Sequence, residues 1–242
     1  MIEHRTLAEI GGVDIGWLKA KHHFAIGQYG NPTHKAVGRL YVWNDDEIAP
    51  RAGFSLHPHA DVEIITYVRE GVITHEDDLG NKGRTKAGDV QVMSAGTGIR
   101  HSERNDEETP TRIFQIWIKP NQVGNPPRWS TQPFPRSDRA GRFVPLASGY
   151  GAPDALPIRA DAEVFGAVLA AGGSIKLELK VGHDAYLVPA LGSVLVNGVR
   201  VEAREGVALR DEPSLEVEAL CDAEMVLVVA ANSPTRRQQS GL

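Results

Sequence analysis

The chain has 242 residues, a formal net charge of −5, an apolar fraction of 41% and a charged fraction of 24%. This composition is ordinary for a globular protein, and the length suffices for one large β domain or two small ones. The acidic balance, without a clustered basic face, argues against nucleic acid as a partner. No apolar run approaches the roughly 20 residues of a membrane span, and a single cysteine, Cys221, excludes an internal disulfide. We therefore expect a cytoplasmic, soluble protein that binds neither nucleic acid nor membranes.

Short segments rich in Val, Ile, Tyr and Phe recur between turn signals, a pattern typical of an all-β sandwich or barrel. The sequence DLGNKG at 78–83 predicts one turn, and Asn197-Gly198 predicts a two-residue hairpin turn. Helical periodicity is scarce, so a short helix is expected only after Asp161 or within residues 1–12. The expected strands lie within residues 38–44, 63–77, 89–96, 111–119, 193–203 and 215–231.

Proline and glycine are dense between residues 126 and 160, which indicates a structured linker or long crossover between two halves. This position predicts an N-terminal barrel over residues 1–125 and a C-terminal barrel over residues 161–233. The last residues, 234–242, are polar and are expected to form a solvated tail.

The two halves share an order of strands and glycines. Residues 67–92 can be aligned with residues 187–209, which pairs Gly71 with Gly192. The alignment predicts that the β-barrel is duplicated within the chain.

Metal-binding side chains gather in HPHADVE, which begins at His57, and in HSE, which begins at His101. His57 and His59 are two residues apart, so both project from one face of a strand, and His101 and Glu103 repeat this spacing. If the two strands meet across a barrel interior, three imidazoles and one carboxylate converge. Such a set suits a first-row metal such as Fe, Ni, Cu, Mn or Zn, and it leaves positions open for substrate or dioxygen. Other histidines, among them His75, have no partner at ligand spacing.

The second half lacks this constellation. The offsets that connect His57 and His59 to the glycine of the first half lead to Glu178 and Lys180 in the second. Because a lysine would repel a cation, we expect one metal per chain and a structural role for the C-terminal barrel.

The block GDVQVMSAGTGIRHSE, which ends at Glu103, resembles the matching motif of the pirin family within the cupin superfamily. The order of Gly53, the HPH pair, Glu63 and Gly71 is similar to the first cupin motif, although two spacers differ by a residue or two. The resemblance covers most of the chain. It implies a bicupin of two jelly-roll-like barrels with metal in the N-terminal barrel only.

The resemblance implies that His57, His59, His101 and Glu103 are the ligands, whereas in many other cupins the carboxylate corresponding to Glu63 is the fourth. Strand parity does not decide, because Glu63 faces the same side as His57 and His59. Glu103 lies two residues from a ligand, but Glu63 lies roughly 13 Å beyond His59 along an extended strand. We therefore expect Glu103 to bind the metal, and Glu63 to orient an imidazole N–H or lie at the rim.

Bacterial pirin-like proteins resemble quercetin 2,3-dioxygenases, which open the central ring of a flavonol with dioxygen and release carbon monoxide. The resemblance implies a dioxygenase of flavonols such as quercetin, with Glu103 as the base for the flavonol 3-hydroxyl. It favours Fe(II), although the same ligands would hold Ni, Cu, Mn, Co or Zn. One alternative is a regulatory protein whose metal state alters a surface for protein partners; another is a cupin enzyme for a different enol. Candidates for an aromatic pocket wall are Phe24, Tyr29, Trp43, Phe54, Ile99, Phe114 and Trp117.

Overall fold

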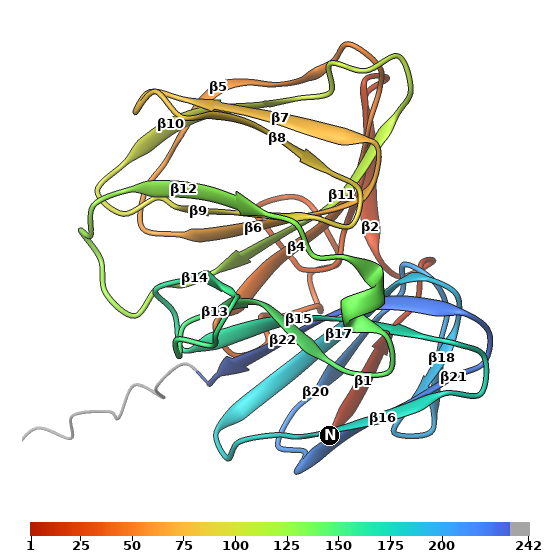
Figure 1. Ribbon diagram of the computed structural model, residues 1–242. Coiled ribbons are helices and arrows are strands. Elements are labelled where there is room, and N and C mark those ends of the chain that lie inside the picture. Colours follow the sequence, from red (N-terminus) through yellow and green to blue (C-terminus); the bar gives the residue numbers. More distant parts are fainter. Residues whose placement is uncertain (233–242) are drawn as a thin grey trace, which may run out of the picture.

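The computed structural model describes residues 1–232, which form two stacked β-barrels, each built from a seven-stranded and a four-stranded sheet (Figure 1). The expected polar tail, residues 234–242, lies outside the described residues. The larger sheet of the N-terminal barrel contains, in spatial order, β12 (Arg128–Gln132), β9 (Val90–Ser94), β6 (Glu63–Glu70), β11 (Thr111–Ile118), β4 (Leu40–Ile48), β3 (Leu18–His22) and β2 (Gly11–Asp14). Its smaller sheet contains β5 (Gly53–His59), β10 (Ile99–Arg104), β7 (Val72–Asp77) and β8 (Lys82–Lys86).

The C-terminal barrel repeats this arrangement. Its larger sheet contains β1 (Ile2–Arg5), β20 (Gly206–Leu209), β17 (His183–Leu191), β22 (Ala223–Ala231), β15 (Ala162–Leu169), β13 (Val144–Ser148) and β14 (Leu156–Pro157). Its smaller sheet contains β16 (Ser174–Glu178), β21 (Ser214–Ala219), β18 (Val194–Val196) and β19 (Val199–Val201). The order β5-β10-β7-β8 in one barrel thus corresponds to β16-β21-β18-β19 in the other, which confirms the predicted duplication.

The hairpins explain why the sequence repeat was visible. Gly71 and Gly192 join equivalent strands, and their φ angles of 78° and 76° lie in the left-handed region that favours glycine. Asn197 and Gly198 have φ angles of 46° and 83° and connect β18 to β19, as the two-residue turn requires.

Burial patterns distinguish the two kinds of sheet. In the smaller sheets one face is exposed, and β21 alternates buried and exposed residues along its length. Strands β6 and β9 are buried on both faces, because one face lines the barrel interior and the other packs against the second barrel. A shared hydrophobic core joins the larger sheets, in which Trp43 and Tyr186 from different barrels have ring centroids 5.6 Å apart.

The segments at the domain boundaries depart from the predicted division. Strand β1 pairs with β20, so residues 2–5 belong to the C-terminal barrel although they begin the chain (Figure 1). The expected linker supplies β12 to the first barrel and β13 and β14 to the second. In each case a short strand covers the edge of a sheet that would otherwise expose unpaired backbone groups.

The expected helices are absent from residues 1–232. The segment after Asp161 forms β15, paired with β13 and β22, and the first residues form β1 and the start of β2. The one helix in the described residues is a 3₁₀ turn, η1 (Arg136–Arg139). No helix of the described chain is long and apolar enough to cross a membrane.

Candidate metal centre

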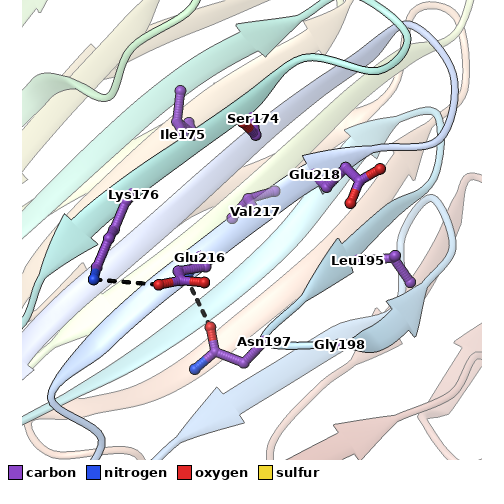
Figure 2. Close-up of a pocket in the computed structure, with 9 residues that line it drawn as sticks. All are labelled: Ser174, Ile175, Lys176, Leu195, Asn197, Gly198, Glu216, Val217 and Glu218. Atoms are coloured by element: carbon purple, nitrogen blue, oxygen red, sulfur yellow. Dashed lines mark hydrogen bonds and ion pairs between the residues drawn. The ribbon is translucent and has the colours of Figure 1, made fainter.

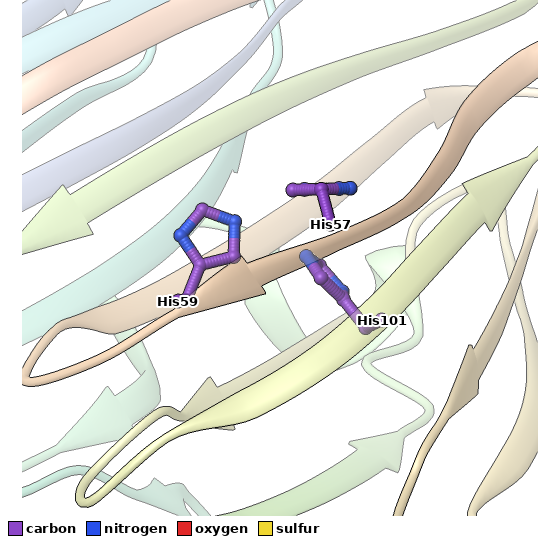
Figure 3. A group of neighbouring side chains, drawn as sticks. All are labelled: His57, His59 and His101. Atoms are coloured by element: carbon purple, nitrogen blue, oxygen red, sulfur yellow. The ribbon is translucent and has the colours of Figure 1, made fainter.

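Three histidines converge on the inner side of the smaller sheet of the N-terminal barrel (Figure 3). Strands β5 and β10 are antiparallel, with His57 directly opposite His101 and His59 opposite Ile99. One ring nitrogen from each histidine can act as a ligand, and these atoms all lie within 4.8 Å of one another. Of all His, Cys, Asp and Glu side chains in residues 1–232, only these three form such a group.

Hydrogen bonds assign a free nitrogen to two of the rings. The Nδ1 of His57 lies 2.7 Å from the Ser55 carbonyl oxygen and therefore donates to it, which leaves Nε2 bare. The Nε2 of His101 is buried and has no hydrogen-bond partner. A buried polar atom without a partner costs free energy, and a metal ion bound between the rings would satisfy it. The residues present therefore fit a metal.

The electrostatic environment keeps two of the imidazoles, those of His59 and His101, neutral. Burial, followed by the neighbouring His101 and His57 rings, lowers the pKa of His59 to about 4. Burial, followed by His57 and His75, lowers the pKa of His101 to about 3. Neutral imidazole is the form that binds metal, so these two rings are ready to act as ligands at neutral pH.

Glu103 lies beside the three histidines but outside the group. A register shift separates it from His101 on β10, and its side chain is buried in the barrel interior. Its carboxylate accepts hydrogen bonds from Gln91 Nε2 at 2.7 Å, from Thr66 Oγ1 at 3.2 Å and from Gln115 Nε2. Its charge also acts on the pKa of His59, in the direction that raises it. Side chains from three strands of the larger sheet, Thr66, Gln91 and Gln115, thus hold the carboxylate in the barrel interior.

Glu63 lies elsewhere, and the prediction that it orients an imidazole or lies at the rim is wrong, because it is buried and bonded to Ser94. Its carboxylate accepts a hydrogen bond from Ser94 Oγ at 2.6 Å, and Arg128 Nε donates to the same hydroxyl. Asp61, with φ of 50°, breaks the strand between His59 and Glu63, so strand parity does not carry across. The carboxylate therefore faces away from the barrel interior that contains the imidazoles.

The predicted aromatic wall is divided between two places. Trp117 packs edge-on against His59 with a centroid distance of 5.0 Å, and Phe54 lies 6.2 Å from His57. Ile99 is buried in a cluster that also includes Trp117. By contrast, the predicted wall residues Phe24, Trp43 and Phe114 belong to the core between the barrels, and Tyr29 is exposed.

The C-terminal barrel differs in its interior. Apolar side chains fill it, including Leu215 and Val217 on the strand equivalent to β10. Glu178 is exposed at the end of β16, and Lys180 lies beyond that strand over the ring of Tyr150. A groove of about 470 Å³ on this barrel is lined by polar and apolar side chains of β16 and β21, by Leu195 of β18 and by the turn at Asn197 (Figure 2). The described residues of this barrel contain no group of metal ligands.

Known proteins resemble most of the chain. A family model described as Pirin matches residues 3–118, and one described as the quercetinase C-terminal cupin domain matches residues 145–228. A "Pirin-like protein" of Caulobacter vibrioides is 58% identical over 96% of this chain and 100% of its own length. A "Quercetin 2,3-dioxygenase" of Escherichia coli (strain K12) is 36% identical over 94% of this chain and 97% of its own length. The crystal structure of bacterial pirin YhhW in complex with nickel(II), from Escherichia coli, has a TM-score of 0.90 and 33% identity, covering 96% of this chain and 100% of that one.

Proposed function

The chain belongs to the pirin family of cupin proteins, and on that premise we propose that it is a metal-dependent dioxygenase that opens the central ring of a flavonol. The reaction consumes dioxygen and releases carbon monoxide, with quercetin as the expected substrate. The observation that carries the proposal is the buried, unpartnered Nε2 of His101, which faces two further imidazoles in the barrel interior. The name of the Escherichia coli relative supports the choice of reaction.

We propose that His57, His59, His101 and Glu103 together hold one divalent transition metal. The three imidazoles already converge, and Glu103 is buried two residues from His101 in the same barrel interior. The family resemblance favours Fe(II), while the solved relative contains nickel(II). Ligands of this kind also accept Cu, Mn, Co or Zn, so the donor set does not select the metal.

A bound divalent metal supplies Lewis acidity at the oxygen of the deprotonated flavonol. Glu103 is the proposed base, which accepts the proton of the flavonol 3-hydroxyl. The side-chain amides of Gln91 and Gln115 donate to Glu103 and hold its carboxylate in one orientation. Since the amides come from two different strands, β9 and β11, the base is fixed by the barrel itself.

Aromatic side chains near the imidazoles suit a flat aromatic substrate. Trp117 packs against His59, and Phe54 lies close to His57 with its own edge contact to Trp17 at 5.1 Å. Aromatic faces of this kind bind the rings of a flavonol by offset or edge-on packing and keep water away from the reacting oxygen.

The test is oxygen uptake by protein stripped of metal and then reloaded separately with iron, nickel, copper, manganese, cobalt or zinc. We expect quercetin-dependent oxygen uptake, with an equal amount of carbon monoxide, for at least one redox-capable metal. Quercetin mixed with the same metal and no protein controls for spontaneous oxidation. Protein that holds one metal per chain and consumes no oxygen with any of the metals would refute the proposal.

A further inference from the structure

A second buried histidine lies directly behind the metal centre. Strand β7 pairs with β10, which places His75 opposite Glu103 and Asp77 opposite His101. His75 is completely buried, and its Nδ1 lies 3.4 Å from the Nδ1 of His101, at the long end of hydrogen-bonding distance. His75 is outside the group of possible ligands, and the proposed reaction gives it no task.

Asp77 determines which nitrogen of His75 carries a proton. Its Oδ2 lies 2.9 Å from His75 Nε2, and both side chains are completely buried. Its Oδ1 accepts the backbone N–H groups of Leu79 and Asn81, each at 3.0 Å. Because an ionised carboxylate only accepts hydrogen bonds, His75 must donate from Nε2. The Nδ1 of a neutral His75 is then a bare acceptor.

This acceptor determines the tautomer of His101. The Nδ1 of His101 faces the bare Nδ1 of His75, so the single proton of a neutral His101 belongs on Nδ1. Its Nε2 is then bare, and this is the buried atom without a partner. The hydrogen-bond series from Asp77 through His75 to His101 thus directs the lone pair of His101 Nε2 toward the place where the three imidazoles meet.

Stacking against a tryptophan also fixes the orientation of the His75 ring. Trp129 of β12 stacks on it with a centroid distance of 4.7 Å and an interplanar angle of 7°. Position 83 must be glycine for the indole to fit, because a Cβ there would lie 2.3 Å from the Trp129 ring. The ring plane, the tautomer and the hydrogen-bond partner of His75 are therefore all constrained by surrounding residues.

We propose that Asp77 and His75 are positioning residues, which fix the tautomer and orientation of His101 as a metal ligand. The inference rests on the metal centre of the proposed function, but it does not depend on a flavonol as the substrate. Outer partners of this kind typically contribute about 10- to 100-fold to metal affinity.

The competing explanation is that His75 merely fills space against Trp129, and two substitutions separate the two roles. His75→Phe keeps an aromatic ring for Trp129 but removes the acceptor for His101. His75→Asn loses the ring, but its Oδ1 is an acceptor near the position of the original Nδ1. Positioning predicts that His75→Phe weakens metal binding more, whereas packing alone predicts that His75→Asn does.

Nickel(II) affinity is measured on metal-free protein by competition with a coloured chelator, and the free energy of unfolding is measured in urea on the same samples. We expect affinity to fall about 10- to 100-fold in His75→Phe and to change by less than about 3-fold in His75→Asn. His23→Phe is the matched control, because His23 is equally buried but hydrogen-bonds Tyr186 at the domain interface. It should lower the free energy of unfolding without changing nickel affinity.

Asp77→Asn tests the same series of hydrogen bonds without removing a ring. Its Oδ1 can keep the bonds to Leu79 and Asn81, while its amide N–H₂ replaces the acceptor beside His75 Nε2. We expect a loss of nickel affinity of about 10-fold or more. Unchanged affinity in both Asp77→Asn and His75→Phe would overturn the inference. An unmodified protein that binds no nickel would instead overturn the metal centre on which the proposed function also depends.

Discussion

The N-terminal barrel contains two buried glutamates, and they provide a matched test of the proposed ligand set. Glu103 lies in the barrel interior, where its carboxylate accepts from Gln91 and acts on the charge of His59, whereas Glu63 accepts from Ser94 on the opposite side of the barrel wall. We predict that Glu103→Gln loses most of its metal affinity and that Glu63→Gln retains it. Glutamine is the substitution of choice because it preserves the side-chain volume in both buried positions.

The hydrogen bonds of Glu103 set the expected cost to the fold. Its carboxylate accepts two amide N–H donors, from Gln91 and Gln115, and glutamine can present an oxygen to only one of them. One buried donor then remains unpaired, which costs about 1–3 kcal/mol in the free energy of unfolding. Glu63→Gln is the milder change, because its amide oxygen can still accept from Ser94 and only the backbone N–H of Arg159 loses its carboxylate oxygen. Its free energy of unfolding should change by less than about 1 kcal/mol.

Metal affinity is then compared only on protein that is folded. We expect Glu103→Gln to exceed the roughly 10- to 100-fold loss typical of an outer partner, because a ligand itself is removed. Chelator competition with nickel(II) measures the affinity, and urea unfolding of the metal-free protein measures the stability. Equal affinity losses in Glu103→Gln and Glu63→Gln, or full retention in Glu103→Gln, would refute the assignment of Glu103 as the fourth ligand.

Three other charged sites give outcomes that can be measured separately. Glu178→His combined with Lys180→His should leave the metal content at one per chain, since no carboxylate faces the apolar interior there; two metals per chain by elemental analysis would contradict this. Burial, and then neighbouring carboxylates, raise the pKa of Asp46 well above its usual value, so the folded protein favours the protonated side chain. The free energy of unfolding therefore falls as the pH rises from about 4 through the folded-state pKa. Asp46→Asn should flatten this decline in urea unfolding as the pH rises above about 4, and an unchanged slope would count against it. Arg139→Met removes one of two arginine partners of the buried Glu224, and Arg136 remains as the other. The unfolding free energy in urea should therefore fall by less than the roughly 3–5 kcal/mol of a buried pair that is broken completely, and a loss below about 1 kcal/mol would show that the pair is not important.

Features encoded over a few residues were predictable from the sequence. The spacing of His57 and His59 places both rings on one face of a strand whatever the tertiary structure, and Asn197-Gly198 defines its own hairpin. The equivalence of Gly71 and Gly192 was visible because a left-handed φ angle restricts the residue at each position.

Features that depend on pairing across the sheet were not predictable. His75 had no partner at ligand spacing along the chain, because its partner, His101, lies on the neighbouring strand and not nearby in sequence. The segment after Asp161 is rich in alanine, yet it forms β15 because strands pair with it on both sides. Local propensity is weak compared with such pairing.

Parity within a strand explains which predicted pocket residues were misplaced. Trp117 and Phe114 are both on β11, but they are three residues apart and so point to opposite faces. Trp117 reaches His59 in the barrel interior, while Phe114 joins the core between the barrels. The sequence identifies both as aromatic strand residues, and only the register of β11 with its neighbours decides which face lines the site.

The contrast between the two interiors suggests why the chain has a second barrel. The N-terminal interior contains polar groups that do not find full partners, including the buried Nε2 of His101 and the Oδ1 of Asp46. Such groups cost stability, whereas the C-terminal interior is filled by apolar side chains whose burial is favourable. Because β1 and the shared aromatic core connect the barrels, the C-terminal barrel can stabilise a neighbour whose interior is shaped for metal binding. On this argument the C-terminal barrel needs no ligands of its own, and replacing its apolar interior with histidines would weaken the support for the first site.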